Sequence, residues 1–300
     1  MSTAGEHRAG FVALVGRPNV GKSTLMNRLI GRKVAIVSDK PQTTRNRIAG
    51  ICTRDDHQII FMDTPGVHRS EVLFNREMVK VALKTLDEVD VTLWLMDAAD
   101  PLSEEDRFLA QHLRSVAPPV LLALNKVDLV RKETLLPLID RCAKGFRVAE
   151  VVPISAKTGD NLPRLEGLLR QYLPVGPPLY PPDRVTDQPE HLLVGEIIRE
   201  KVLALTHDEI PYAVAVRVEE MREREGDGIL DVQATIFVEK DSQKGILIGA
   251  GGQRLKRIGQ MAREDMEGLF GTRVYLGLWV KVLKAWRKDP EWLRRLGYLP

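Results

Sequence analysis

Residues 16–23 combine two glycines, a lysine and a serine at a spacing that suits the binding of phosphate groups. The segment reads Gly-Arg-Pro-Asn-Val-Gly-Lys-Ser and directly follows the apolar run 11–15. Glycines let backbone N–H groups turn inward around an anion, and a helix that begins near Gly21 points the positive end of its dipole at the same place. Lys22 can then reach the β- and γ-phosphates, and Ser23 offers a hydroxyl to Mg²⁺. The spacing predicts a phosphate-binding loop between a strand and a helix.

Two further segments supply polar groups that suit the same Mg²⁺ ion. Asp63 ends the apolar run 59–62 and is followed by Thr-Pro-Gly. Because open α/β sheets bind ligands at the carboxyl ends of their strands, we expect Asp63 to hold Mg²⁺ through water. The backbone N–H of Gly66 is expected near the γ-phosphate. In the segment 41–45, Pro-Gln-Thr-Thr-Arg, a threonine hydroxyl is expected to complete the coordination, although each of these short segments alone also fits an ordinary turn.

The segment 125–128, Asn-Lys-Val-Asp, follows the apolar run 120–124 and carries the base specificity. The Asp128 carboxylate accepts from the ring N–H and the amino group of guanine, whereas adenine offers no such pair of donors. Residues 155–157, Ser-Ala-Lys, follow another apolar run and are expected to support the base through backbone and stacking contacts. A surface loop also favours these residue types, but the common order and the strand-end positions favour a GTP site.

These segments define the predicted site. We expect the nucleotide to lie against Gly16, Arg17, Pro18, Asn19, Val20, Gly21, Lys22, Ser23, Thr24, Thr43, Thr44, Asp63, Thr64, Pro65, Gly66, Val67, Asn125, Lys126, Val127, Asp128, Ser155, Ala156 and Lys157. The predicted Mg²⁺ ligands are Ser23, Thr44 and Asp63, and the residues predicted to assist catalysis are Lys22, Asn19, Thr44 and Gly66. Since valine at position 67 cannot orient a water molecule as a glutamine does in several GTPases, we predict slow intrinsic hydrolysis.

The elements that position these segments alternate in type over residues 10–173. Strands are predicted near Phe11, Ile59, Val91, Val120 and Val151, and helices near Leu25, Met78, Ser103, Leu135 and Leu165. The alternation predicts a doubly wound, mostly parallel sheet. Residues 48–53 predict an antiparallel strand at its edge. Ser103, with Asp106 three residues later, predicts the capped start of a helix.

A change of pattern begins at Pro174. The stretch 174–182, Pro-Val-Gly-Pro-Pro-Leu-Tyr-Pro-Pro, cannot continue a helix and is expected to be extended and semi-rigid. The predicted organisation is a flexible N-terminus over 1–9, a first domain over 10–174, a linker over 175–190 and a second domain over 191–300. In the second domain we expect a helix over 192–205, strands over 213–218 and 231–238, a glycine-bearing turn between two helices, and a last strand over 274–282.

The net charge of +3 conceals an uneven distribution. Residues 183–239 contain 6 basic and 14 acidic residues, whereas residues 240–300 contain 13 basic and 6 acidic ones. A basic segment around a glycine-rich turn favours nucleic-acid binding, because glycines permit close backbone approach and cations neutralise phosphates. The apolar residues 246–248 beside the turn are expected to hold flat bases.

Residues 16–23, 41–45 and 63–66 together resemble the Era family of bacterial GTPases. Residues 242–259, Ser-Gln-Lys-Gly-Ile-Leu-Ile-Gly-Ala-Gly-Gly-Gln-Arg-Leu-Lys-Arg-Ile-Gly, are similar to the RNA-binding segment of that family's C-terminal KH domain. The resemblance covers about residues 10–298. It implies an α/β P-loop GTPase domain followed by an α+β type II KH domain. It also implies GTP or GDP and Mg²⁺ as ligands, and a switch that binds the 3′ end of 16S rRNA and assists 30S assembly.

The resemblance also implies which residues meet RNA. Residues 249–252 correspond to the G-x-x-G loop that clamps a nucleic-acid backbone. Era-like loops commonly carry a lysine where this chain has alanine at position 250, a loss for which the cations at 254 or 256 are candidates to compensate. The expected RNA-binding residues are Lys244, Ile248, Gly249, Ala250, Gly251, Gly252, Gln253, Arg254, Lys256 and Arg257.

Several expectations concern ligands and location. Asn19 resembles an asparagine that binds K⁺ in related GTPases, which makes K⁺ a candidate activator of hydrolysis. No apolar run is long enough to span a membrane, the polar start is no signal peptide, and the cysteines at 52 and 142 are isolated. We therefore expect a cytoplasmic protein. We also expect a monomer. The basic residues near Trp286, Trp292 and Tyr298 allow a peripheral contact with the inner face of the cell membrane, although packing is the favoured role of these aromatic residues.

Two other functions remain open from the sequence. A GTPase that serves RNA modification also uses the patterns of residues 16–23 and 43–45, but the KH-like end and the lack of a placed nucleophile argue against it. A membrane-associated signalling GTPase would use the basic C-terminal segment to bind lipid.

Overall fold

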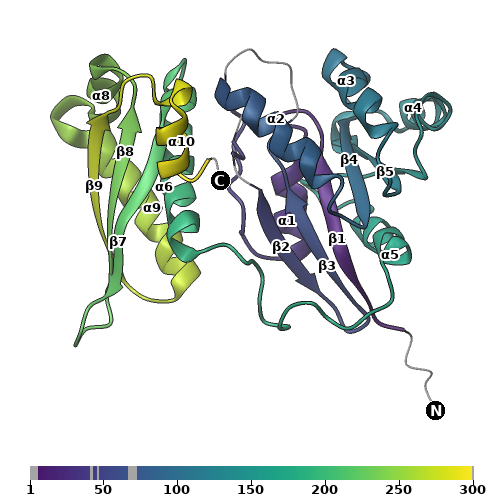
Figure 1. The fold of residues 1–300 in the computed structure, drawn as a ribbon, viewed down its shortest axis with the longest axis horizontal. Helices are drawn as coiled ribbons and strands as arrows, with labels where there is room; N and C mark the ends of the chain where they lie inside the picture. The colour runs from purple at the N-terminus through teal and green to yellow at the C-terminus, as the bar shows by residue number, and fades with distance from the viewer. Residues whose placement is uncertain (1–5, 41–42, 46, 67–72, 299–300) are drawn as a thin grey trace. The chain divides into compact units, whose positions relative to one another are not determined.

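A computed structural model describes residues 6–40, 43–45, 47–66 and 73–298 of the chain (Figure 1). The chain divides into two compact units, the first formed mainly by residues up to Asp187 and the second mainly by residues from Gln188 onward. Each unit has its own hydrophobic core. Pro41, Gln42 and Val67, which belong to the predicted site segments, lie outside the described residues.

A six-stranded sheet lies at the centre of the first unit. Its strands, in order across the sheet, are β2 (Ile48–Thr53), β3 (His57–Asp63), β1 (Arg8–Val15), β4 (Val91–Asp97), β5 (Val120–Asn125) and β6 (Glu150–Pro153). β2 runs antiparallel to β3, and the other neighbours pair in parallel. The predicted doubly wound sheet with an antiparallel edge strand is confirmed. β1 pairs with β3 on one side and with β4 on the other, so the order in which strands are added to the sheet reverses at β1. Such sheets bind ligands at the carboxyl ends of the strands beside this point.

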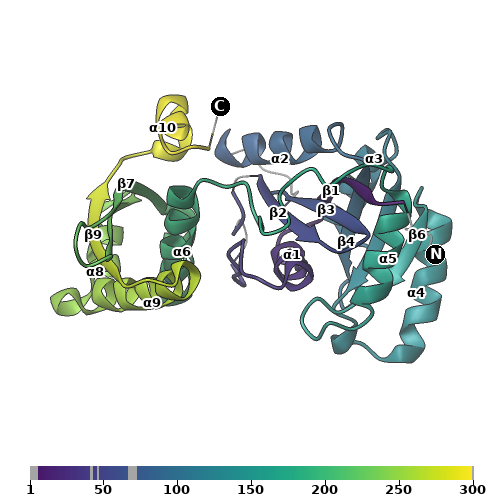
Figure 2. The same ribbon diagram turned by 90° about the horizontal axis from the view of Figure 1, so that it is seen from below.

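Helices cover both faces of this sheet (Figure 2). α1 (Lys22–Ile30) and α5 (Leu162–Tyr172) pack on one face, and α2 (Leu73–Thr85), α3 (Glu104–Leu113) and α4 (Lys132–Gly145) pack on the other, with the short helix η1 (Val127–Leu129) after β5. The predicted cap of α3 is confirmed. The hydroxyl of Ser103 accepts from the Asp106 N–H at 3.1 Å, and the Asp106 carboxylate accepts from the Ser103 N–H at 3.1 Å.

The proline-rich stretch is held along the edge of the first unit. The N–H of Ile51 donates to the Val185 carbonyl at 2.8 Å. The amide nitrogen of Gln58 donates to the Tyr180 carbonyl at 2.9 Å, while its oxygen accepts from the N–H groups of Leu179 and Tyr180. Prolines prevent this stretch from forming a helix. The fully buried side chain of Gln58 instead satisfies three backbone groups of the stretch, at Leu179 and Tyr180.

A three-stranded sheet and its helices form the second unit. The strands are β7 (Ala215–Glu223), β8 (Leu230–Val238) and β9 (Val274–Val282), with β8 antiparallel to β7 and parallel to β9. α6 (Glu190–Leu205), α8 (Asp241–Ile248) and α9 (Gln253–Phe270) pack on one face, while α10 (Pro290–Arg295) lies over the other (Figure 2). Three short helices complete the unit: α7 (Ile210–Ala213), η2 (Ala250–Gly252) and η3 (Trp286–Lys288). The predicted order of helices and strands is present.

The first strand of this unit differs from its predicted bounds. Residues 210–213 form a short helix, and the strand continues past Val218, its predicted end, through charged residues to Glu223. A β-bulge between Val218 and Glu220 lets the charged residues keep pairing with β8. Trp286 and Tyr298 are buried, and the indole N–H of Trp286 donates to the Ala213 carbonyl at 3.0 Å, in agreement with a packing role. Among the described residues, none of the helices has both the length and the apolar character needed to cross a membrane.

A charged cluster joins β3 to α5. The buried ring of His57 lies 2.7 Å from an Asp56 oxygen and 3.1 Å from a Glu166 oxygen. The hydrogen bond with Glu166, and then that with Asp56, raise the pKa of His57 against the opposing effect of burial. Arg54 and Arg170 pair with the same carboxylates at 2.8 and 3.0 Å. The protonated ring is therefore stabilised in the folded state.

We predict a pH-dependent contribution of His57 to stability. Because folding raises this pKa above the value of about 6.5 of an unfolded chain, the stabilisation is complete below that pH and is lost as the pH rises through the higher folded pKa. In urea unfolding between about pH 5.5 and about pH 9, the excess free energy of unfolding of wild type over His57→Gln should fall with rising pH. His112→Gln, whose ring bonds the Phe108 carbonyl instead of a carboxylate, is the control. An excess that stays constant across the series would contradict the prediction.

Candidate nucleotide site and nucleic-acid groove

The phosphate loop connects β1 to α1, as predicted. Gly21 has a φ of 101°, and a Cβ there would lie 2.4 Å from the side-chain nitrogen of Asn125, so only glycine fits at this position. Gly66 closes the other side, since a Cβ on it would lie 2.8 Å from the backbone of Pro18. The loop is therefore packed against both the 125–128 segment and the end of β3.

Lys22 is buried beneath this loop. Its ammonium donates to the carbonyls of Gly16 and Arg17, at 3.0 Å each. Burial lowers the pKa of Lys22 to about 8, while the negative charge of Asp63 acts in the opposite direction. The ammonium thus lies inside the loop that is predicted to hold phosphates, where an anion would favour its charged form.

The three predicted Mg²⁺ ligands lie together. The Ser23 hydroxyl donates to Asp63 Oδ2 at 2.6 Å, and the Thr44 hydroxyl lies 3.0 Å from the Ser23 oxygen and 3.3 Å from the same carboxylate oxygen. Asp63 is fully buried, which raises the pKa of its carboxyl. Its Oδ1 is also buried and has no hydrogen-bond partner among the described residues. Two hydroxyls and a carboxylate with an unsatisfied oxygen form an all-oxygen donor set that suits Mg²⁺.

Asn125 connects the phosphate loop to the base-recognition segments. Its side-chain nitrogen donates to the Val20 carbonyl at 2.7 Å, and its side-chain oxygen accepts from the Ala156 N–H at 2.8 Å. The hydroxyl of Ser155 donates to Asp128 Oδ1 at 2.6 Å and accepts from the Thr158 N–H. The Asp128 carboxylate is thereby oriented at the carboxyl end of β5.

Other predicted residues have structural partners. The Thr64 hydroxyl donates to the Leu14 carbonyl at 2.7 Å, and the Thr43 hydroxyl donates to the Lys40 carbonyl at 2.6 Å. Within the described residues, the Thr43 hydroxyl therefore bonds a backbone carbonyl, whereas Thr44 belongs to the cluster with Ser23 and Asp63. Asn19 has a φ of 60°, so the loop turns at this residue.

Sequence reasoning missed two groups that position this site. Asp97, at the carboxyl end of β4, pairs with the Lys126 ammonium at 2.6 Å and lies 3.7 Å from the Arg17 guanidinium. Arg28 on α1 donates to the carbonyls of Lys157 and Thr158 at 3.2 and 2.7 Å. The strand-end position of Asp97 was an available signal, because the other site segments also follow strands.

The glycine-rich turn of the second unit joins α8 to α9. Gly249, Gly251 and Gly252 have φ values of 74°, 56° and 79°. Nothing lies within 4 Å of a Cβ placed on Gly251 or Gly252, so their backbone is open to a ligand. The guanidinium of Arg254 donates to the Ile246 carbonyl and thus holds the end of α8. One expectation was wrong: Leu247 is fully buried in the core and cannot hold a base, because it lies on the face of α8 that packs on the sheet.

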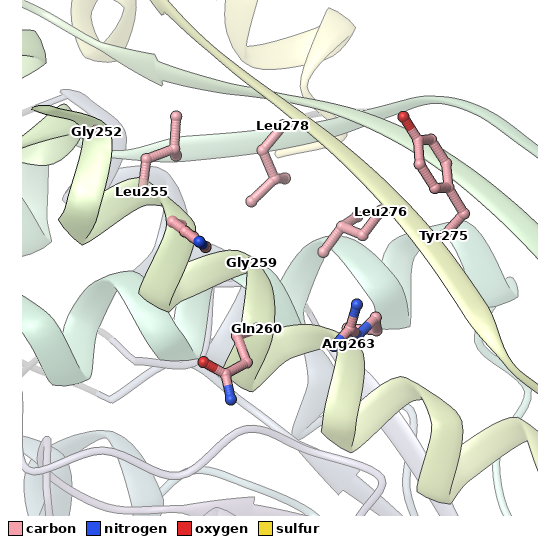
Figure 3. A pocket seen from close by; sticks show the side chains of 9 residues that line it. Gly252, Leu255, Gly259, Gln260, Arg263, Tyr275, Leu276 and Leu278 are labelled. Carbon is pink, nitrogen blue, oxygen red and sulfur yellow. The ribbon is translucent and has the colours of Figure 1, made fainter.

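A groove extends from this turn between α9 and β9 (Figure 3). Its volume is about 520 Å³. Gly259 brings α9 close to β9, since a Cβ there would lie 3.4 Å from Leu278. The groove is lined by Gly252, Leu255, Lys256, Gly259, Gln260, Arg263, Tyr275, Leu276 and Leu278. Of these, only Gly252 and Lys256 were predicted. The groove residues of α9 recur at a spacing of about one helical turn, which places them on one side of the helix. This spacing identifies them as groove residues only when the position of β9 is known.

Comparison with known proteins follows the division into two units. Residues 11–126 match the family model described as 50S ribosome-binding GTPase, and residues 209–287 match the model of the KH domain. A GTPase Era from Staphylococcus haemolyticus is 49% identical over 294 residues, which cover 98% of each protein. The chain belongs to the Era family of GTPases.

Two solved Era structures are similar over the whole length of the chain. One is a variant of Aquifex aeolicus Era bound to GDP and AlF₄⁻, and the other is Era in complex with MgGDPNP and nucleotides 1506–1542 of 16S ribosomal RNA. Each is 42% identical, has a TM-score of 0.95, and aligns over 98% of this chain and 100% of its own. The predicted family and the predicted fold, a P-loop GTPase domain followed by a KH domain, are confirmed.

We predict that Asp97→Asn weakens guanine-nucleotide binding. The asparagine keeps the shape of Asp97 but removes the charge that holds Lys126. Charge-assisted hydrogen bonds contribute about 1.5–3 kcal/mol, so a loss of about 1 kcal/mol, or about fivefold in Kd, is expected. The measurement is the Kd of fluorescently labelled GDP, with Asp100→Asn as control because Asp100 pairs with Arg17 at 2.6 Å and not with Lys126. Equal affinities of wild type and Asp97→Asn would refute the positioning role.

Proposed function

We propose that this chain is a slow GTPase switch that binds the 3′ end of 16S rRNA and assists assembly of the 30S subunit. The observation that carries the proposal is the presence, in one Era-family chain, of the cluster formed by Ser23, Thr44 and Asp63 and of the groove beside the glycine-rich turn. The first suits Mg²⁺ and a nucleotide, and the second suits single-stranded RNA. The proposed boundaries are a GTPase domain over 10–174, a linker over 175–190 and a KH domain over 191–300.

In the proposed nucleotide complex, Ser23, Thr44 and Asp63 hold Mg²⁺, Asp63 through water. When bound, Mg²⁺ neutralises charge that develops on the β- and γ-phosphate oxygens. Lys22 exchanges its two loop carbonyls for phosphate oxygens, and the Gly66 N–H contacts the γ-phosphate. Asp128, oriented by Ser155, accepts from the two guanine donors and so excludes ATP.

The proposed RNA complex uses the cations that line the groove. Arg254 is already bonded to the Ile246 carbonyl, whereas Lys256 and Arg263 line the groove itself. Of the two cations expected to offset the missing lysine at position 250, Lys256 is therefore the better placed. Gly251 and Gly252 admit the nucleic-acid backbone, and the Leu276 and Leu278 side chains offer apolar surface to bases.

The proposed place of action is the cytoplasm, where 30S subunits assemble. A peripheral fraction at the inner face of the cell membrane would contact anionic lipid through the basic residues at 287, 288, 294 and 295, which lie in η3 and α10.

RNA binding tests the function directly. The full-length protein, loaded with GDP or a non-hydrolysable GTP analogue, is titrated with a 16S rRNA 3′-end oligonucleotide and a scrambled control over a salt series. We expect specific binding that changes with the nucleotide. Lys256→Ala should weaken it and reduce the slope of log K against log salt by about 0.7 to 1, because one phosphate contact is lost.

Lys284→Ala is the matched control, since Lys284 is basic and exposed but does not line the groove. Equal affinity for both oligonucleotides in both nucleotide states would reject the RNA-binding switch and leave only the nucleotide site.

We predict that K⁺ accelerates GTP hydrolysis through Asn19. A monovalent cation beside the phosphates would supply the charge that an arginine finger supplies elsewhere. Phosphate release by the chain alone should be faster in K⁺ than in Na⁺, and Asn19→Ala should abolish the difference while GDP affinity stays within about threefold of wild type. Equal rates in both salts would exclude this role of Asn19.

A further inference from the structure

Two half-exposed aromatic side chains lie on one face of the edge strand β9. Tyr275 is 51% exposed and Trp279 is 50% exposed. Alternate residues of a strand point to opposite faces, and Val274 and Val280 belong to the core beneath the helices. Tyr275 and Trp279 therefore lie on the opposite face of the sheet. α10 covers this face at Phe237, where Trp292 packs, and the uncovered part with Tyr275 and Trp279 is called the open face. Since aromatic side chains bury large areas where they can, two exposed rings on one strand indicate a surface that a ligand covers.

The ring of Trp279 lies along the strand. A Cβ on Gly277 would lie 3.0 Å from the outer ring atom Cη2 of Trp279 and 2.0 Å from the Gln233 side-chain oxygen. The indole thus extends back over Gly277, while half of the Trp279 surface stays exposed to solvent. An exposed aromatic ring is a surface on which a nucleic-acid base can stack.

Two arginines lie on the same face of the sheet as these rings, and both are paired with carboxylates. The Arg224 guanidinium lies 4.7 Å from the Tyr275 ring centroid and bonds Asp231. Arg217 pairs with Glu219 and lies in register with Thr235, the neighbour of Trp279 on β8. Because their charges are largely balanced, this face offers stacking more than electrostatic attraction.

The open face is continuous with the groove. Tyr275 lines the groove as well as lying on the open face. In Figure 3, Leu276 and Leu278 point from β9 toward α9, whereas Tyr275 points away. β9 is at the edge of the sheet, and within the described residues its strand neighbour is β8 alone. RNA that leaves the groove reaches the open face by crossing a single strand.

We propose that the open face of the β7–β8–β9 sheet is a second RNA-binding surface, on which Trp279 and Tyr275 stack unpaired bases that flank the nucleotides held in the groove. The inference rests on the proposed RNA-binding function and extends it to nucleotides outside the groove. The ligand class is single-stranded RNA, bound through base faces and therefore with little sequence preference.

The test compares two RNAs on the full-length protein. One is a groove-length oligonucleotide of about four nucleotides, and the other carries about six further unpaired nucleotides on each side. Trp279→Ala should weaken binding of the long RNA by about 5- to 150-fold, since one stacked base is lost. Its affinity for the short RNA should equal that of wild type. Trp279→Phe should retain most of the affinity. Lys256→Ala should weaken the binding of both RNAs and reduce the slope of log K against log salt. Trp279→Ala should leave that slope unchanged.

Fluorescence gives a second readout. Trp94 and Trp286 are buried and Trp292 is partly buried against Phe237, whereas Trp279 is half exposed. The long RNA should quench tryptophan emission and the short one should not. Trp279→Phe should remove this quenching, whereas Trp292→Phe should retain it.

The outcomes separate this inference from the function on which it rests. If wild type binds neither RNA, the RNA-binding function fails, and the second surface with it. If wild type binds both but Trp279→Ala does not change their affinity ratio, the second surface alone is rejected. Loss of self-association in Trp279→Ala with unchanged RNA affinity would assign the face to a second copy of the chain and likewise overturn the proposal.

Discussion

The buried side-chain amide of Asn125 is the interaction on which the nucleotide site depends. It is bonded on one side to the Val20 carbonyl in the phosphate loop and on the other to the Ala156 N–H. Asn125 is 2% exposed, so an unmade bond there would cost about 1–3 kcal/mol with no water to replace it. The phosphate loop and the base-recognition segments are consequently held at a fixed spacing. The missing side chain of Gly21 makes this approach possible, which ties the loop glycine to base recognition as well as to phosphate binding.

The charged groups of the nucleotide site are buried in the same region as this amide. Lys22 and Asp63 are both buried. Burial lowers the pKa of Lys22 and raises the pKa of Asp63, and both changes favour the neutral form. Internal partners offset the cost, since Lys22 bonds two loop carbonyls and Asp63 accepts from Ser23 and Thr44. A bound nucleotide with Mg²⁺ would exchange these partners for stronger, oppositely charged ones. Binding would thus exchange hydrogen bonds within an enclosed site for charge-assisted ones.

Much of the fold and the nucleotide site could be predicted because each motif has a local cause. The glycine spacing, the strand-end positions and the cap formed by Ser103 and Asp106 can each be recognised from a few neighbouring residues. What escaped prediction depends on pieces that come together only in the fold. Asp97 lies 29 residues before its partner Lys126, and its strand-end position alone does not reveal that pairing. Tyr275 is far in sequence from the turn whose groove it lines. The charged half of β7 lacks a typical strand sequence and is a strand because β8 pairs with it.

The two glycine-rich turns require glycine for different physical reasons. In the phosphate loop, any side chain on Gly21 would collide with Asn125, so glycine serves packing inside an enclosed site. In the turn between α8 and α9, Gly251 and Gly252 face open space, and positive φ alone requires glycine there. A substitution at Gly21 therefore disturbs the nucleotide site by displacing Asn125, whereas one at Gly251 acts by straining the backbone that the proposed RNA contact uses. The second turn can vary in side chain, as it does at Ala250, provided that its backbone keeps this course.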